Sequence, residues 1–126
     1  MSVGGKTKGE QQRELTIRVL DELNVEATPA HIGHMTVLLR AFSIFVDRNK
    51  RHQDGWRVAG TTGIMVDIRK KVERMWTEYV LTDKEDQPRD ADSALDAINY
   101  SAFLVRAVDE EQTTGNPVGN WKWKKD

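Results

Sequence analysis

The chain has 126 residues, with 19 basic and 20 acidic side chains and no cysteine. This length fits one domain with a hydrophobic core, and a net charge near zero gives no global reason to expect nucleic-acid or membrane binding. The lack of cysteine excludes disulfides, thiolate zinc sites and cysteine nucleophiles. Because the sequence shows neither a signal-peptide core nor an apolar run of bilayer-spanning length, we expect a soluble cytoplasmic protein.

The first half of the chain predicts two helices. Residues 1–9 are rich in glycine and lysine and are expected to form a disordered start. Apolar spacing predicts a first helix over 10–23. A second helix is expected over 29–50, because Thr28 is a candidate N-cap and Pro29 suits the first helical position.

The second half predicts two more helices and no β-strand. Three glycines in residues 52–63 predict a loop, and a third helix is expected over 62–80. The charged, proline-containing segment 82–92 predicts a mobile connection. A fourth helix is expected over 91–111, and a glycine stop signal begins the tail, residues 113–126.

The expected architecture is an all-α bundle of four helices in a single domain, residues 10–112. Matched apolar periodicities place six side chains of three helices in its interior: Phe42, Ile68, Val72, Leu95, Ile98 and Ala102. Further apolar residues, Val37 and Ile44, lie on another side of the second helix. We therefore expect a homo-oligomer, at least a dimer.

Two pairs of charged residues are the candidates for chemistry. Asp92 and Asp96, in the stretch DSALDAINY, lie one turn apart on one helical face. Lys71 and Arg74 share one face of the preceding helix. If the two faces meet, they form either interhelical salt bridges or a phosphate site, in which the carboxylates hold Mg²⁺ and the cations neutralise a polyphosphate.

These motifs resemble a known family. The sequence resembles the MazG-like all-α nucleoside triphosphate pyrophosphohydrolases, in a phage and bacterial group associated with nucleotide modification. The resemblance lies in the order GIMVDIRKKVERM, an acidic connection and DSALDAINYSAFL. The likeness covers about residues 40–105, and RNKRHQDGW at 48–56 resembles the loop upstream of the motifs. The residues that match its motifs are Lys71, Arg74, Met75, Asp92, Asp96 and Tyr100.

The resemblance implies a hydrolase dependent on Mg²⁺, or on Mn²⁺, that cleaves a nucleoside triphosphate to the monophosphate and pyrophosphate. It implies a dimer or tetramer. The balanced charge and the lack of an apolar spanning run lead us to expect no membrane or nucleic-acid partner, and a cytoplasmic protein, in the host cytoplasm if it is phage-encoded. Asp92 and Asp96 would be the catalytic residues and metal ligands, with Lys71 and Arg74 on the phosphates. Further candidate nucleotide contacts or acids are Asn99, Trp56, Asp47 and Asp67.

One departure from the family leaves other functions open. The Glu-x-x-Glu motif of the wider superfamily is missing, and the second helix offers only Asp47. The alternatives are a nucleotide-binding or sequestering module without turnover and a small helical interaction protein whose charges are merely at the surface. A further carboxylate within reach of the Asp92 and Asp96 pair would favour the hydrolase over the binding module.

Three other features have an alternative and simpler explanation. His31 and His34 have a spacing that can ligate zinc, but without a third ligand we expect them to be solvated. His52 could act as a base, although no neighbour in sequence would orient it. The tail WKWKK, residues 121–125, could stack on a base or dock on a neighbouring helix or subunit.

Overall fold

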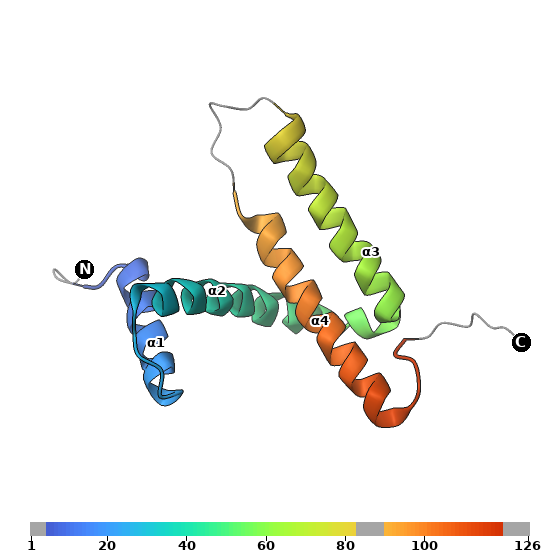
Figure 1. The fold of residues 1–126 in the computed structure, drawn as a ribbon, viewed down its shortest axis with the longest axis horizontal. Helices are drawn as coiled ribbons and strands as arrows, with labels where there is room; N and C mark the ends of the chain where they lie inside the picture. The colour runs from blue at the N-terminus through green and yellow to red at the C-terminus, as the bar shows by residue number, and fades with distance from the viewer. Residues whose placement is uncertain (1–4, 83–89, 120–126) are drawn as a thin grey trace, which may run out of the picture. The chain divides into compact units, whose positions relative to one another are not determined.

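The structure is a computed structural model that describes residues 5–82 and 90–119. The described residues form four α-helices and no β-strand, which confirms the all-α class (Figure 1). The chain divides into two compact units, residues 1–43 and 44–126. The division falls within the second helix, so this helix contributes to both units.

The first unit contains α1 (Lys8–Glu22) and the first part of α2 (Pro29–His52). α1 begins two residues before its predicted start because Thr7 and Glu10 form a capping box. The Glu10 N–H donates to the Thr7 hydroxyl at 3.1 Å, and the Glu10 carboxylate accepts the Thr7 N–H at 3.1 Å. This backbone hydrogen bond from Thr7 holds the pKa of Glu10 below its ordinary value.

α2 starts as the sequence predicts. The Thr28 hydroxyl accepts the backbone N–H of His31 at 3.1 Å, and Pro29 is the first helical residue. α1 and α2 meet through buried Thr16, whose hydroxyl is 3.1 Å from that of Thr36. Leu20 is also buried here, so the first unit has a small core of its own.

The second unit contains the end of α2, α3 (Trp56–Trp76), the π-helical turn η1 (Thr77–Leu81) and α4 (Asp92–Thr114). α3 and α4 pack side by side and antiparallel (Figure 1). α4 ends at Gly115, which adopts φ 75° and confirms the predicted glycine stop.

The predicted loop over 52–63 is wrong for most of its length. α2 continues to His52 and α3 begins at Trp56, so only residues 53–55 connect them. Of the glycines in this stretch only Gly60 breaks the helix, with φ 70° and ψ −179°, and it kinks α3. Gly63 stays helical, and a Cβ there would lie 2.7 Å from the Ala59 Cβ, so this glycine permits close packing.

The core of the second unit is a cluster of Ile64, Ala107 and Val118. Partly buried side chains pack around it: Trp56, Ile68, Tyr100, Phe103 and Leu104. Leu95 is also buried, with 2% of its surface exposed.

Three of the six predicted interior residues are wrong. Val72 is 51% exposed, Phe42 is 58% exposed, and Ala102 is also exposed. On α3, Ile64 packs in the core while Lys71 reaches α4. Val72 follows Lys71 by one residue, about 100° around the helix, and therefore turns away from α4.

Parts of three predictions lie outside the described residues. These are residues 1–4 of the start, 83–89 of the charged connection, and 121–125, which form the WKWKK stretch.

Within the described residues, α2 is long and apolar enough to span a bilayer by length and composition alone. A mostly buried core helix of a soluble protein passes the same test, but only 11% of this apolar stretch of α2 is buried. The expectation of a soluble protein therefore stays a prediction.

Replacing Ile64 by alanine tests the core of the second unit. Ile64 is 1% exposed, so Ile64→Ala should lower the free energy of unfolding by about 2–5 kcal/mol. Val72→Ala on the same helix is the matched control and should change it by less than about 0.5 kcal/mol. Chemical denaturation of both variants gives the comparison, and equal losses would contradict the assigned inward face of α3.

Candidate functional site

Asp96 lies between two cations from two other helical segments. Its Oδ1 is 2.6 Å from Arg48 Nη1 on α2, and its Oδ2 is 2.9 Å from Lys71 Nζ on α3. The Asp96 side chain is only 9% exposed and the Lys71 side chain 22%, whereas that of Arg48 is half exposed. These two ion pairs, here called the Asp96 triad, connect the end of α2, α3 and α4.

The two cations keep Asp96 ionised. Burial raises the pKa of Asp96, but the hydrogen bonds from Lys71 and Arg48, with the attraction of their charges, outweigh this effect. The pKa therefore lies below its ordinary value of 3.8.

A pocket of about 360 Å³ lies beside the triad. Four aromatic rings line it, and they pack around Phe103. The Trp56 ring is stacked on Phe103 with centroids 5.5 Å apart, and Phe45 and Tyr100 meet Phe103 edge to face at 5.7 and 5.9 Å. The polar lining of this aromatic pocket comes from Arg48, Asn49, His52, Asp67, Asp96 and Asn99.

A second pocket of about 300 Å³ adjoins the first and carries most of the positive charge. Lys70, Lys71 and Arg74 line this cationic pocket. Asp67 and Tyr100 line both pockets, so the two spaces are neighbours. Together they form a hollow with an aromatic part and a cationic part.

A polar network holds Trp56, which lines the aromatic pocket. Asp54 accepts the indole N–H of Trp56 at 3.1 Å and lies 3.5 Å from the Arg106 guanidinium. Arg106 in turn lies over the Trp56 ring, 4.8 Å from its centroid. The backbone of Asp54 is left-handed, with φ 60°, and its N–H donates to Asn49 Oδ1 at 2.7 Å. These contacts leave the indole little freedom to turn.

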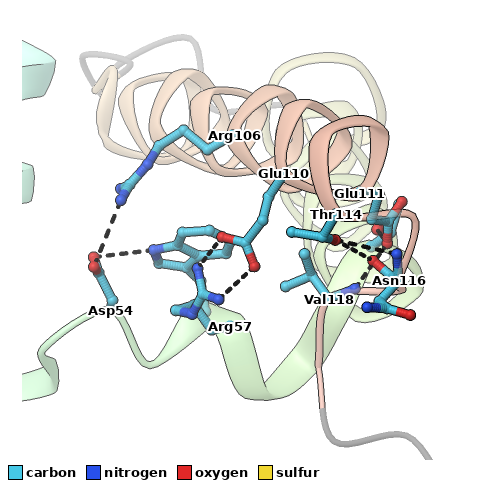
Figure 2. A network of polar contacts seen from close by, with 10 residues as sticks. Asp54, Arg57, Arg106, Glu110, Glu111, Thr114, Asn116 and Val118 are labelled. Atoms are coloured by element: carbon cyan, nitrogen blue, oxygen red, sulfur yellow. Dashed lines mark hydrogen bonds and ion pairs between the residues drawn. The ribbon is translucent and has the colours of Figure 1, made fainter.

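Arg57 on α3 and Glu110 on α4 form a two-pronged ion pair at 2.6 and 2.5 Å (Figure 2). The hydrogen bonds between Arg57 and Glu110 lower the pKa of Glu110 and raise the pKa of Arg57.

Glu111 holds the segment that follows α4 against α3. Its Oε2 accepts the Thr61 hydroxyl at 2.8 Å and the Val118 N–H at 3.0 Å. Val118 is thereby brought into the core, and Gly119 lies against the kink of α3. A Cβ on Gly119 would be 3.0 Å from the Gly60 Cα, so this close approach requires glycine.

The structure brings some predicted site residues together. Lys71 pairs with Asp96 across the helices, and Arg74 lines the cationic pocket while pairing with Glu78 at 3.5 Å. Trp56, Asn99 and Asp67 line the aromatic pocket.

Two predicted residues do not join them. Asp92 is exposed and lines neither pocket. Asp47 is also exposed, pairs with Arg51 at 3.9 Å and lines neither pocket.

The sequence reasoning missed most of one wall of the pocket, which consists of residues at the end of α2; of these it considered only His52, as a candidate base. Phe45, Arg48, Asn49 and His52 recur at spacings of three and four, so they occupy one helical face. This face begins with an apolar side chain and continues with cationic and amide side chains. That change of character was the signal in the sequence that could have indicated a pocket wall.

Comparisons of the chain with models of protein families, with curated proteins and with solved structures found no match.

Replacing Asp96 tests the triad. Asp96→Asn removes the charge that largely buried Lys71 and half-exposed Arg48 share, so the free energy of unfolding should fall by about 1–3 kcal/mol at pH 7. Asp92→Asn, one turn away on the exposed surface, should leave it within about 0.5 kcal/mol. Equal effects of the two substitutions would contradict the structural role of Asp96.

The same contribution should depend on pH. Because the folded-state pKa of Asp96 is depressed, its stabilisation is present above the unfolded value near 3.8 and is lost as pH falls through the folded value. Denaturation curves from pH 7 down to pH 2 should therefore converge for the wild type and Asp96→Asn. A gap that stays constant would show that the ionised carboxylate is not its source.

Proposed function

We propose that the protein binds nucleoside polyphosphates. The observation that supports this best is the adjacency of an aromatic pocket and a cationic pocket, which share Asp67 and Tyr100. A base is flat and aromatic, whereas the phosphates attached to it through the sugar are strongly anionic. Both chemical demands of one nucleotide therefore have a matching surface, with the base beside Trp56 and Phe103 and the phosphates beside Lys70, Lys71 and Arg74.

The dimensions and charges agree with such a ligand. A pocket of about 360 Å³ is within the usual range for small-molecule sites. Four cationic side chains and two carboxylates line the two pockets. This excess of positive charge favours a polyanion over a neutral nucleoside.

The Asp96 triad also fits this function. The Asp96 carboxylate offsets one of the two positive charges of Arg48, which lines the aromatic pocket, and Lys71, which lines the cationic pocket. A phosphate group can take over part of that role, because its oxygens offer the same charge and hydrogen-bond acceptors.

Hydrolysis with Mg²⁺ or Mn²⁺ is a second candidate function. Asp67 and Asp96 line one pocket, which favours it. A resident Mg²⁺ nevertheless does not fit these residues, because both Asp96 oxygens hold cations and no three metal-ligating side chains gather in the parts of the chain that the structure describes. We therefore place binding first and derive no step that runs through a metal.

The proposed function agrees with the resemblance to the MazG-like pyrophosphohydrolases, whose bundle is the finer fold that we propose. We further propose a cytoplasmic homo-oligomer. Large apolar side chains are exposed on several helices, among them Val46, Met65, Val66 and Trp76. A second copy could cover part of this apolar surface.

A binding assay tests the first candidate. Calorimetry with ribo- and deoxynucleoside triphosphates should show binding that persists in EDTA and weakens as salt rises. Lys70→Ala and Arg74→Ala should each weaken it about tenfold, the effect of losing one charge-assisted hydrogen bond. Arg69→Ala is the matched control, because Arg69 lies on the same helix, pairs with Glu73 and lines neither pocket.

Two outcomes would contradict the assignment. An absence of any nucleotide-induced rise in melting temperature would favour the helical interaction protein. Release of pyrophosphate with Mg²⁺ would instead make hydrolysis the function.

The oligomer is tested by light scattering. At micromolar concentration we expect at least twice the 14.4 kDa mass of the chain, because the exposed apolar side chains are buried on association. A mass equal to that of one chain would contradict this prediction.

A further inference from the structure

The polar wall that α2 contributes to the aromatic pocket consists of Arg48, Asn49 and His52. Arg48 can only donate, and one of its nitrogens is already held by Asp96. For Asn49, a neighbouring hydrogen bond determines which end of the amide is free.

The orientation of the Asn49 amide follows from its neighbour Asp54. The backbone N–H of Asp54 lies 2.7 Å from the Asn49 side chain, and an N–H can donate only to the oxygen of that amide. Gln53 and Asp54 both adopt left-handed backbone conformations, with φ 44° and 60°, and this turn directs the Asp54 N–H back at α2. The Asn49 oxygen is thereby engaged.

The amide nitrogen of Asn49 is left as a donor at the pocket. No atom in residues 5–82 and 90–119 accepts a hydrogen bond from it. Asn49 lines the aromatic pocket and not the cationic one, so it lies on the part of the hollow that the proposed function assigns to the base. The edge of a base that is remote from its sugar carries the exocyclic group at position 4 of a pyrimidine or position 6 of a purine.

We infer that Asn49 determines base specificity, and that the pocket prefers bases with a carbonyl oxygen at that exocyclic position over bases with an amino group there. The inference rests on the proposed function, because it assigns the base to the aromatic pocket. A carbonyl oxygen accepts the Asn49 N–H, whereas an amino group would place two donors against each other and leave both without a partner. The preferred ligands are therefore nucleotides of uracil, thymine, guanine or hypoxanthine.

Matched nucleotide pairs isolate this contact. UTP and CTP differ in the exocyclic group at position 4, and ITP and ATP differ in the group at position 6, while sugar and phosphates stay the same. Calorimetry in EDTA should give UTP tighter binding than CTP, and ITP tighter binding than ATP, each by about fivefold or more.

Asn49→Asp should reverse the preference. The new carboxylate can still accept the Asp54 N–H through one oxygen, but it presents an acceptor where the amide presented a donor. Its added charge weakens all triphosphates alike, so the ratio within each pair is the measurement. Asn116→Asp is the matched control, because Asn116 lines neither pocket and the ratios should stay as in the wild type.

A second variant keeps the inference testable if Asn49→Asp fails to fold. Asn49→Ala removes the donor without adding a charge and should bring both ratios close to one. Binding of all four nucleotides with equal affinity would overturn this inference and leave the proposed function standing. A wild-type preference that survives in Asn49→Ala would overturn the role of Asn49, and no binding of any nucleotide would overturn the proposed function itself.

Discussion

The buried carboxylate of Asp96 is the constraint on which the second unit depends. Its two oxygens take cations from α2 and α3, so one side chain links the end of α2, α3 and α4. Burial removes water from the carboxylate at a cost of several kcal/mol, and the two cations offset that cost. Arg48 and Asp96 line the aromatic pocket and Lys71 lines the cationic pocket, so residues of this contact border both.

Local signals in the sequence were sufficient for the helix ends that depend on neighbouring residues. Thr28 and Pro29 start α2, and Gly115 ends α4, because a cap needs only the side chain and backbone of one turn. The stretch around Gly60 could not be predicted in this way. The sequence shows where the glycines are, but not which of them adopts a non-helical conformation. Gly60 does so where Val118 and Gly119, nearly sixty residues later in the chain, pack against α3.

In the site, too, features of a single helix could be predicted from the sequence, whereas contacts between distant segments could not. The spacing of Lys71 and Arg74 placed both at one face, and the pairing of Lys71 with Asp96 follows from helices that run antiparallel. Arg48 reaches the same carboxylate from 48 residues away in sequence. No periodicity reports such a contact, because it exists only once three segments are packed. Asp92 lies one turn before Asp96 on the same face of α4. It is the first residue of that helix, and its side chain is exposed.

The contact between Gly60 and Gly119 sets an order for folding during synthesis. The two residues are about sixty positions apart, so the loop that joins them closes late. While the ribosome is still making α4, the α3 kink has neither Val118 nor Gly119 against it, and Ile64 lacks part of its apolar cover. Since nascent chains grow at about 5–20 residues per second, this face stays open for seconds, which is the interval in which a chaperone could bind it.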